Sequence, residues 1–383
     1  MTGVALLWQR PGVRSLVWQS LAAACVIVSV AWVAENISGN VARRGLDVDF
    51  GFLARRASFE FGDNLVGYRP GDTFLSAFKA GLANTVLVAA LGIVLATILG
   101  AGLALARLAS NRLLARIAWG WIEAVRNTPL LLQLLFWHQL AIRALPGPRN
   151  AWQILPDTYL SNRGLTFPTL VWQPAMGIAL ALLAASLVAS IALRRVLARR
   201  GAGAALRCLL PPIVALAAPA TTLLLLANPI EVSVPALRGF NFRGGAAVSP
   251  EFVALLVALS VYQAGFMAET IRSGITGVSR GQIEASASLG LSRMQQLRHV
   301  VLPQALRIIV PPVTSQYLSL TKNSSLAVAI GYPDLVRVSQ VTISETGRAI
   351  ECISILLIVY LSLSLLTALL MNLYNRHVMR WRG

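Results

Sequence analysis

Residues 82–108 read LANTVLVAALGIVLATILGAGLALARL, an apolar stretch of 27 residues interrupted mainly by small side chains and Asn84. A helix needs about 20 mostly apolar residues to cross the hydrocarbon core of a bilayer, so this stretch predicts a membrane span. The rest of the chain agrees, because 56% of the 383 residues are hydrophobic and only 13% are charged. A soluble chain carries about 25% charged residues. The composition therefore indicates an integral membrane protein and excludes an ordinary soluble or disordered one.

Seven further segments are candidate spans. An alternative for the first of them is a cleaved signal peptide, because Arg10 and Arg14 precede it. No small-x-small cleavage site follows its core, and Trp32 and Glu35 close it, so an uncleaved span is favoured. The pattern predicts an all-α fold of about eight transmembrane helices. The seven segments are residues 17–33, 129–145, 175–193, 209–226, 252–271, 308–330 and 352–373.

Basic residues are unevenly divided between the two sides of this arrangement. With the N-terminus in the cytoplasm, 19 of the 33 lysines and arginines fall in the inner segments, as the positive-inside rule expects. The long outer loop, residues 38–79, carries both signs of charge in nearly equal number. Most of the formal charge of +18 is therefore a topology signal, and its expected partner is anionic membrane lipid rather than nucleic acid. Both termini are predicted to be cytoplasmic.

The inner loop between the sixth and seventh segments, residues 279–303, reads SRGQIEASASLGLSRMQQLRHVVLP. Ser279 with Gln282, and Ser292 with Gln295, have the spacing of capping boxes, in which each side chain bonds the other residue's backbone N–H. This loop is therefore predicted to form two short helices.

The ends of these helices are also marked. Gly290 suits the left-handed residue that ends the first helix, and Pro303 either ends the second or begins the next span. The first helix has small residues that would let another protein approach closely. An ordinary amphipathic inner loop is the alternative. The small residues are Ala285, Ala287 and Ser288.

The loop resembles a signature of ABC importer permeases, the "EAA" pattern E-A-A-x-x-x-G-x₉-I-x-L-P. Ser286 replaces the second alanine and Val300 replaces the isoleucine, while the other positions match at the family spacing. In that family the loop forms a coupling helix that docks in a groove of the ATP-hydrolysing subunit. The resemblance implies that the coupling residues are Glu284, Ala285, Ser286, Gly290, Leu302 and Pro303.

Three more stretches resemble the polar amino acid uptake permeases of this class. They read EAVRNTPLLLQL at 123–134, YQAGFMAETIRSGI at 262–275 and KNSSL at 322–326. The extra length before the sixth span looks like the longer permease subunit of general L-amino-acid transporters. The resemblance implies a type I ABC importer permease core with extra helices.

The domain organisation expected from this resemblance has three parts. Residues 1–72 form an N-terminal tail, the first span and a periplasmic loop. Residues 73–371 form the permease transmembrane domain, with inserted helices at about 146–250. Residues 372–383 form a cytoplasmic tail.

Polar residues within the spans are candidates for the substrate path, because a charge in a span costs several kcal/mol and usually has a function. Lys322 is either an anchor for a substrate or gating carboxylate, or the partner of a glutamate such as Glu269 or one on another subunit. Serines in spans commonly bond their own helix backbone, which is the alternative for the neighbouring hydroxyls. The path candidates are Lys322, Asn323, Ser324, Ser325 and Thr128.

Two charged pairs at a spacing of three residues share a helix face. Glu123 with Arg126, and Glu269 with Arg272, are interpreted as structural ion pairs at the inner ends of spans.

The sequence predicts no enzyme active site, metal site or cofactor. His138, His299 and His377 are isolated from one another and from the cysteines, and no G-x-x-x-x-G-K-[ST] phosphate loop occurs. ATP hydrolysis is therefore expected in a separate subunit.

A secondary transporter or channel is the alternative to an importer, but the two halves show no convincing repeat. A membrane-embedded enzyme would need groups suited to acid–base work, which glutamate–arginine pairs are not.

The resemblance implies a permease subunit that moves L-amino acids across the bacterial inner membrane by alternating access. The implied partners are an ABC ATPase dimer, a second permease subunit in a heterodimer, and a periplasmic amino-acid-binding protein.

Overall fold

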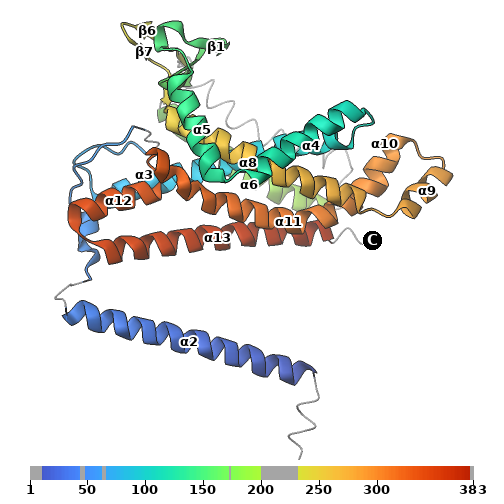
Figure 1. Cartoon of the computed structure of the whole chain (residues 1–383), viewed down its shortest axis with the longest axis horizontal. Helices are drawn as coiled ribbons and strands as arrows, with labels where there is room; N and C mark the ends of the chain where they lie inside the picture. Colours follow the sequence, from blue (N-terminus) through green and yellow to red (C-terminus); the bar gives the residue numbers. More distant parts are fainter. Residues whose placement is uncertain (1–10, 44–47, 63–65, 172–173, 200–231, 380–383) are drawn as a thin grey trace, which may run out of the picture. The chain divides into compact units, whose positions relative to one another are not determined.

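The computed structural model describes residues 11–43, 48–62, 66–171, 174–199 and 232–379 (Figure 1). Contacts between residues divide the chain into two units, Met1–Thr85 with Pro333–Leu370, and Val86–Tyr332 with Met371–Gly383. Each unit has its own buried cores. The predicted division at residues 72 and 371 stays a prediction.

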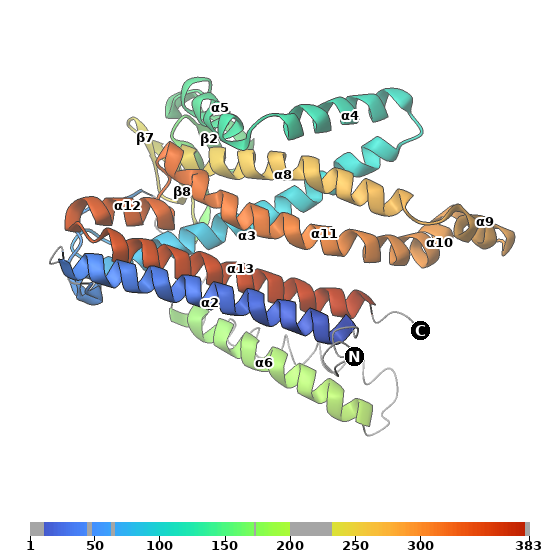
Figure 2. The same ribbon diagram turned by 60° about the horizontal axis from the view of Figure 1, so that its bottom comes forward.

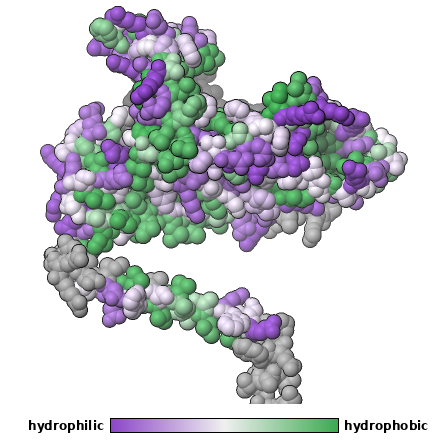
Figure 3. All heavy atoms as spheres, viewed as in Figure 1, coloured by the Kyte–Doolittle hydropathy of each residue, from purple (hydrophilic) through white to green (hydrophobic). Residues whose placement is uncertain are grey.

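Four described helices are long and apolar enough to cross a bilayer, so the count of eight spans is not confirmed. They are α2 (Pro11–Arg43), α3 (Phe74–Leu108), α8 (Pro250–Thr276) and α13 (Ala349–Met379). They cover the first, second, sixth and eighth predicted segments. On α2, Figure 3 shows apolar side chains in the middle of the helix and more polar ones toward its ends.

The other four predicted segments are not among these four helices. The third corresponds to α5 (Leu130–Arg143), whose 14 residues extend about 21 Å, too short for the hydrocarbon core. The fourth corresponds to α6 (Pro174–Arg199), and the fifth lies outside the described residues. The seventh is divided between α11 (Leu302–Asn323) and the 3₁₀ turn η4 (Ser324–Ile330).

A change of backbone hydrogen bonding explains the boundary between α11 and η4. The hydroxyls of Ser324 and Ser325 donate to the carbonyls of Thr321 and Lys322, each at 2.7 Å. Such local bonds compete with the α-helical pattern. The last part of the seventh predicted segment, Ser324–Ile330, therefore forms a 3₁₀ helix instead of continuing α11.

The first unit has an aromatic core between α3, α12 (Leu335–Thr346) and α13. The short helix η1 (Phe50–Ala54) contributes Phe52, which is fully buried and lies 6.0 Å from Phe74, ring centre to ring centre. Asp49 caps η1 by accepting from the backbone N–H of Gly51 at 2.7 Å. The backbone N–H of Asp49 in turn donates to Glu351 at 3.1 Å, which ties this loop to the start of α13.

Asp334 is the buried N-cap of α12, with 1% of its surface exposed. Its Oδ1 accepts from the backbone N–H of Arg337 at 2.8 Å. Burial raises the pKa of the Asp334 carboxyl to about 7, although the backbone N–H groups of Arg337 and Val336 oppose the rise.

Replacing Asp334 by asparagine is expected to remove a pH dependence of stability. The folded chain keeps the proton up to about pH 7, whereas an unfolded chain loses it near pH 3.9. Stability therefore falls by about 1.4 kcal/mol per pH unit between these values and is level above pH 7. Because asparagine also caps helices, Asp334→Asn should be more stable than the wild type at pH 8. Thermal midpoints of the detergent-solubilised protein at pH 5 and pH 8 test this.

Asp49→Asn is the matched control, because Asp49 is an exposed N-cap in the same unit. An unchanged pH slope in Asp334→Asn would contradict the assignment to this carboxyl.

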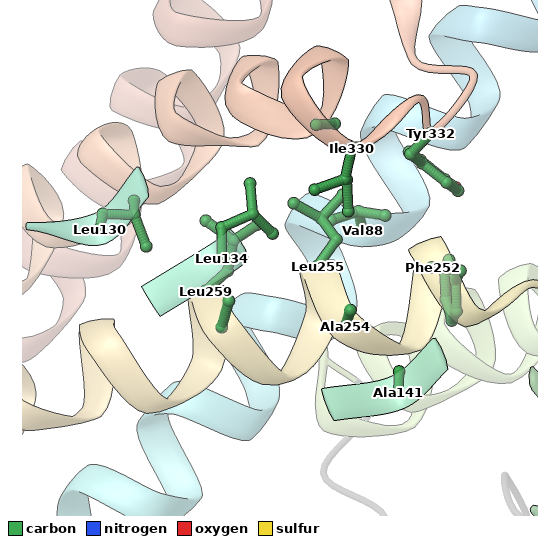
Figure 4. Close-up of a cluster of buried hydrophobic side chains, with 12 residues drawn as sticks. Val88, Leu130, Leu134, Ala141, Phe252, Ala254, Leu255, Leu259, Ile330 and Tyr332 are labelled. Carbon is green, nitrogen blue, oxygen red and sulfur yellow. The ribbon is translucent and has the colours of Figure 1, made fainter. Parts of the chain in front are cut away.

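The second unit is built on α8, which packs against α11 and α5 and against α4 (Arg112–Asn127) (Figure 2). In its core, Leu134 of α5 lies with Leu255 and Leu259 of α8 and with Ile330 and Val88 (Figure 4). These side chains come from four segments of the chain, so the core joins the part of α3 after Thr85 to α5, α8 and η4.

The described part of the chain is mostly helical, as predicted, but short strands between α5 and α8 were not predicted. A four-stranded antiparallel sheet has the order β1 (Trp152–Leu155), β2 (Thr158–Ser161), β3 (Gly164–Phe167) and β8 (Ala246–Val248). Two further antiparallel pairs join β4 (Thr169–Leu170) to β5 (Val232–Ser233), and β6 (Ala236–Arg238) to β7 (Asn241–Arg243). Strands of two to four residues are too short to show a clear alternation, and the β3–β8 pairing joins residues about 80 positions apart.

Candidate functional site

The loop between α8 and α11 folds as predicted into two short helices, α9 (Arg280–Ser288) and α10 (Arg293–Gln296). Gly290 lies between them with φ of +75°, the left-handed conformation that glycine adopts most readily. The second capping box is confirmed: Gln295 N donates to Ser292 Oγ at 3.4 Å, and Ser292 N donates to Gln295 Oε1 at 2.9 Å. The first is wrong, because the Ser279 side chain makes no cap hydrogen bond and only its carbonyl accepts from Gln282 N.

The two helices present an exposed surface beyond the ends of α8 and α11 (Figure 1). Glu284 and the small residues Ala285, Ala287 and Ser288 are exposed on α9. Ser286 differs from them, being only 4% exposed, and its hydroxyl donates to the carbonyl of Ile283 at 2.7 Å. Ser286 therefore lies on the buried side of α9.

Two apolar side chains beside Gly290 were not singled out from the sequence. Leu289 is 80% exposed and Met294 is 71% exposed. Exposed apolar groups on a surface helix indicate an interaction site, and methionine adapts well to a partner's shape. Their position within four residues of the turn-forming glycine is the signal that could have found them.

The loop continues into α11 without a break in the helix. A π-helical turn, η3 (Leu297–Val301), follows α10, and Pro303 lies in the first turn of α11, where a missing N–H costs little. Leu302, 43% exposed, begins α11. A displacement of α10 would therefore act on α11 directly.

Two glycines allow α8 to approach its neighbours closely. A Cβ on Gly274 would lie 2.2 Å from Cγ1 of Ile309 on α11, and a Cβ on Gly100 would lie 2.5 Å from Cβ of Met267. The second contact joins α3 to α8 within the second unit. Because the glycines have no side-chain atoms between the helices, a movement of one helix displaces its neighbour.

Four of the five path candidates, residues 322–325, lie at the end of α11 and the start of η4. Lys322 is exposed, and among the described residues it forms no ion pair. The alternative pairing with Glu269 does not occur, because Glu269 binds Arg272 instead. Asn323 Nδ2 donates to Ser319 Oγ at 3.5 Å.

The hydroxyls of Ser324 and Ser325 bond the backbone one turn earlier, as described above. Thr128 behaves similarly, donating to the carbonyl of Ala124 at 2.8 Å. It precedes α5 and lies apart in sequence from the end of α11.

Both charged pairs are present as ion pairs. Arg272 Nε donates to the two carboxylate oxygens of Glu269 at 3.0 and 3.1 Å. Arg126 Nη1 lies 3.9 Å from Glu123 Oε1, and its guanidinium also lies 5.3 Å from the ring centre of Phe266 on α8. Arg126 therefore links α4 to α8 as well as pairing along its own helix.

Polar pairs inside the second unit were not identified from the sequence. Gln263 on α8 is 2% exposed and donates from Nε2 to Gln316 Oε1 on α11. The hydroxyls of Thr97 and Tyr317 are hydrogen-bonded at 2.9 Å. These pairs join facing helices, and a single sequence does not show which helices face each other.

No group of three or more histidine, cysteine or acidic residues that could hold a metal occurs in the part of the chain that the structure describes.

Comparison with known proteins identifies the family. Residues 92–380 match the family described as binding-protein-dependent transport system inner membrane component. The chain is 44% identical over 382 residues to YhdX of Escherichia coli strain K12, covering 98% of this chain and 96% of that protein. It is 43% identical over 371 residues to the general L-amino acid transport system permease protein AapQ of Rhizobium johnstonii, covering 95% and 92%. It is 35% identical over 399 residues to the glutamate/glutamine/aspartate/asparagine transport system permease protein BztB of Rhodobacter capsulatus, covering 95% and 93%. The chain therefore belongs to the family of inner membrane components of binding-protein-dependent transport systems.

Proposed function

We propose that this chain is a permease subunit of an ATP-driven ABC importer for L-amino acids, with a type I permease core and a preference for polar substrates that extends to a broad range. The names of two relatives support the substrate class, one a general L-amino acid permease and the other a permease for four acidic and amide amino acids. The observation that carries the proposal is the exposed loop of α9 and α10 at one end of α8 and α11.

The proposed partners rest on two features: the absence of a phosphate loop from the sequence, and the exposed residues of the loop that contains α9 and α10. ATP is hydrolysed by a dimer of separate ABC ATPase subunits, since the sequence has no phosphate loop. Glu284 and the exposed apolar side chains of Leu289 and Met294 dock on one of these subunits. A second permease subunit completes the pathway as a heterodimer, and a periplasmic binding protein delivers the substrate.

The mechanism is alternating access. ATP binding brings the ATPase subunits together and moves α9 and α10. Because α10 continues through η3 into α11, the movement reaches α11 and, through the close contact of Ile309 with Gly274, α8. The inner ends of the helices then close and the outer side opens to receive an amino acid.

The orientation follows from the same loop. Placing α9 and α10 in the cytoplasm puts the strands before α8 on the periplasmic side, because α8 separates them by 27 residues of helix, or about 40 Å. The positive-inside distribution supports the same orientation, with both termini cytoplasmic in the bacterial inner membrane.

Lys322 stays the main candidate for contact with a substrate carboxylate, because it is exposed at the end of α11. The hydroxyls of Thr128, Ser324 and Ser325 donate to backbone carbonyls, so they would offer a substrate only their acceptor lone pairs.

The test of this function is ATPase activity of the complete transporter reconstituted with its binding protein, scanned across the twenty amino acids. We expect stimulation by several polar L-amino acids and none by the corresponding D-amino acids. Stimulation by sugars or metal ions instead, or ATPase activity indifferent to every amino acid, would refute the proposed substrate class.

A further inference from the structure

An apolar groove runs along α11 in the second unit. It consists of two adjoining cavities of about 450 and 570 Å³, which share Leu302, Leu306 and Tyr374. The cavity of about 450 Å³ is lined mainly by apolar side chains such as Ile309 and Val313. Walls of this kind match an apolar ligand such as a hydrocarbon chain.

One end of the groove is basic. Arg298 and His299 line the second cavity, and an adjoining polar hollow of about 460 Å³ is lined by the same two residues with Arg307. Arg298 is exposed, and among the described residues no carboxylate forms an ion pair with it. This end therefore offers an uncompensated cation to an anionic group.

A hydrogen-bonded polar pair lines the opposite end of the groove. Thr97 and Tyr317 line it and are hydrogen-bonded to each other at 2.9 Å. From Arg298 to Val313, the last aliphatic residue of α11 that lines the groove, the helical chain rises about 22 Å, at 1.5 Å per residue. One leaflet has a hydrocarbon depth of about 15 Å, with a headgroup region of some 5–7 Å outside it. This stretch, which ends before Tyr317, thus has the length of one leaflet, with its charge at the headgroup level.

We propose that this groove binds an anionic phospholipid of the cytoplasmic leaflet. Its phosphate lies at Arg298 and His299, and one acyl chain lies along Leu302, Leu306 and Ile309. The leaflet assignment rests on the proposed function, which places the loop of α9 and α10 in the cytoplasm.

The size of the groove favours a lipid over a helix of the second permease subunit. A helix 10–12 Å across and about 22 Å long has a volume of roughly 1,700–2,500 Å³. Together the two cavities hold about 1,000 Å³, roughly half of that volume. The basic end also matches a phosphate, and basic pockets on the cytoplasmic side of membrane proteins are known to bind anionic lipid headgroups.

The test uses the complete transporter, purified and examined by native mass spectrometry after exchange into phosphatidylglycerol or phosphatidylcholine. The wild type should retain phosphatidylglycerol in preference to phosphatidylcholine. Arg298→Gln should weaken this retention about fivefold, the factor expected for one basic residue at a membrane surface. Leu306→Trp, which lies outside the loop, should abolish retention by filling the groove. Arg376→Gln, an exposed arginine of α13 that lines neither cavity, is the matched control and should retain the lipid.

Equal retention of both lipids by the wild type would overturn the proposal, as would unchanged retention in Leu306→Trp. A disulfide between Leu306→Cys and a cysteine on the second permease subunit would also overturn it, because the groove would then hold protein. Lipid retention is measured without nucleotide or amino acid, so its outcome is distinct from that of the ATPase scan. A failed scan with intact retention would leave a lipid site in a protein of different function.

Discussion

Charge reversal at Glu284 is expected to reduce amino-acid uptake to background. Glu284 is exposed on α9, in the loop that we propose docks on the ATPase. Reversing a charge that pairs across a desolvated interface costs at least about 2–5 kcal/mol, which corresponds to a loss of thirtyfold or more. Uptake of labelled amino acid into proteoliposomes that contain the complete transporter measures the effect. Purification of the Glu284→Arg complex should show weaker retention of the ATPase, while the binding protein still associates.

The matched control is Glu60→Arg, which reverses an exposed carboxylate outside the loop. It should transport like the wild type. If Glu284→Arg also transported at the wild-type rate, α9 would not be the coupling element. If Glu60→Arg failed equally, the loss would not be specific to the loop of α9 and α10.

An added methyl group at Gly274 is expected to destabilise the second unit and to lower transport. Its Cβ would lie 2.2 Å from Cγ1 and 3.0 Å from Cδ1 of Ile309, so α8 and α11 would have to separate. Overpacking of this kind costs about 1–3 kcal/mol. The thermal midpoint of purified Gly274→Ala should fall, and coupling of ATP hydrolysis to uptake should fall with it.

A double-mutant cycle makes this prediction specific. Ile309→Ala removes both clashing atoms, so Gly274→Ala with Ile309→Ala should be less destabilised than the sum of the two single variants. Gly102→Ala in α3 is the control, because nothing lies within 4 Å of the added Cβ. Additive effects of the two changes would show that this contact does not control the spacing of α8 and α11.

The capping signals show how far a sequence predicts local structure. Gly290 and the pair Ser292–Gln295 adopt the predicted conformations, because a left-handed residue and a capping box involve only neighbouring backbone. Ser279 has the same spacing to Gln282, yet its hydroxyl makes no cap bond. There the chain leaves α8 through Gly277, and the direction of that exit depends on the packing of α8.

The exposure of Ser286 illustrates a second limit. The motif places it among residues expected to dock on the ATPase, and the structure buries it. Helical spacing shows that Ser286 and Ala285 lie on different faces, but it does not show which face meets the protein. Only the packing of α9 against the rest of the second unit decides that.

The sequence by itself predicted the membrane class, the four of its eight spans whose helices are long enough to cross a bilayer, the charge asymmetry and the two short helices of the loop. Each depends on the composition or spacing of a continuous stretch, because a span needs only apolar length and a cap needs only nearby residues. The tertiary structure decided the β3–β8 sheet, the contact of Gly274 with Ile309 and the groove along α11. These features join residues distant in sequence, and their geometry follows from how whole helices pack, which no local pattern specifies.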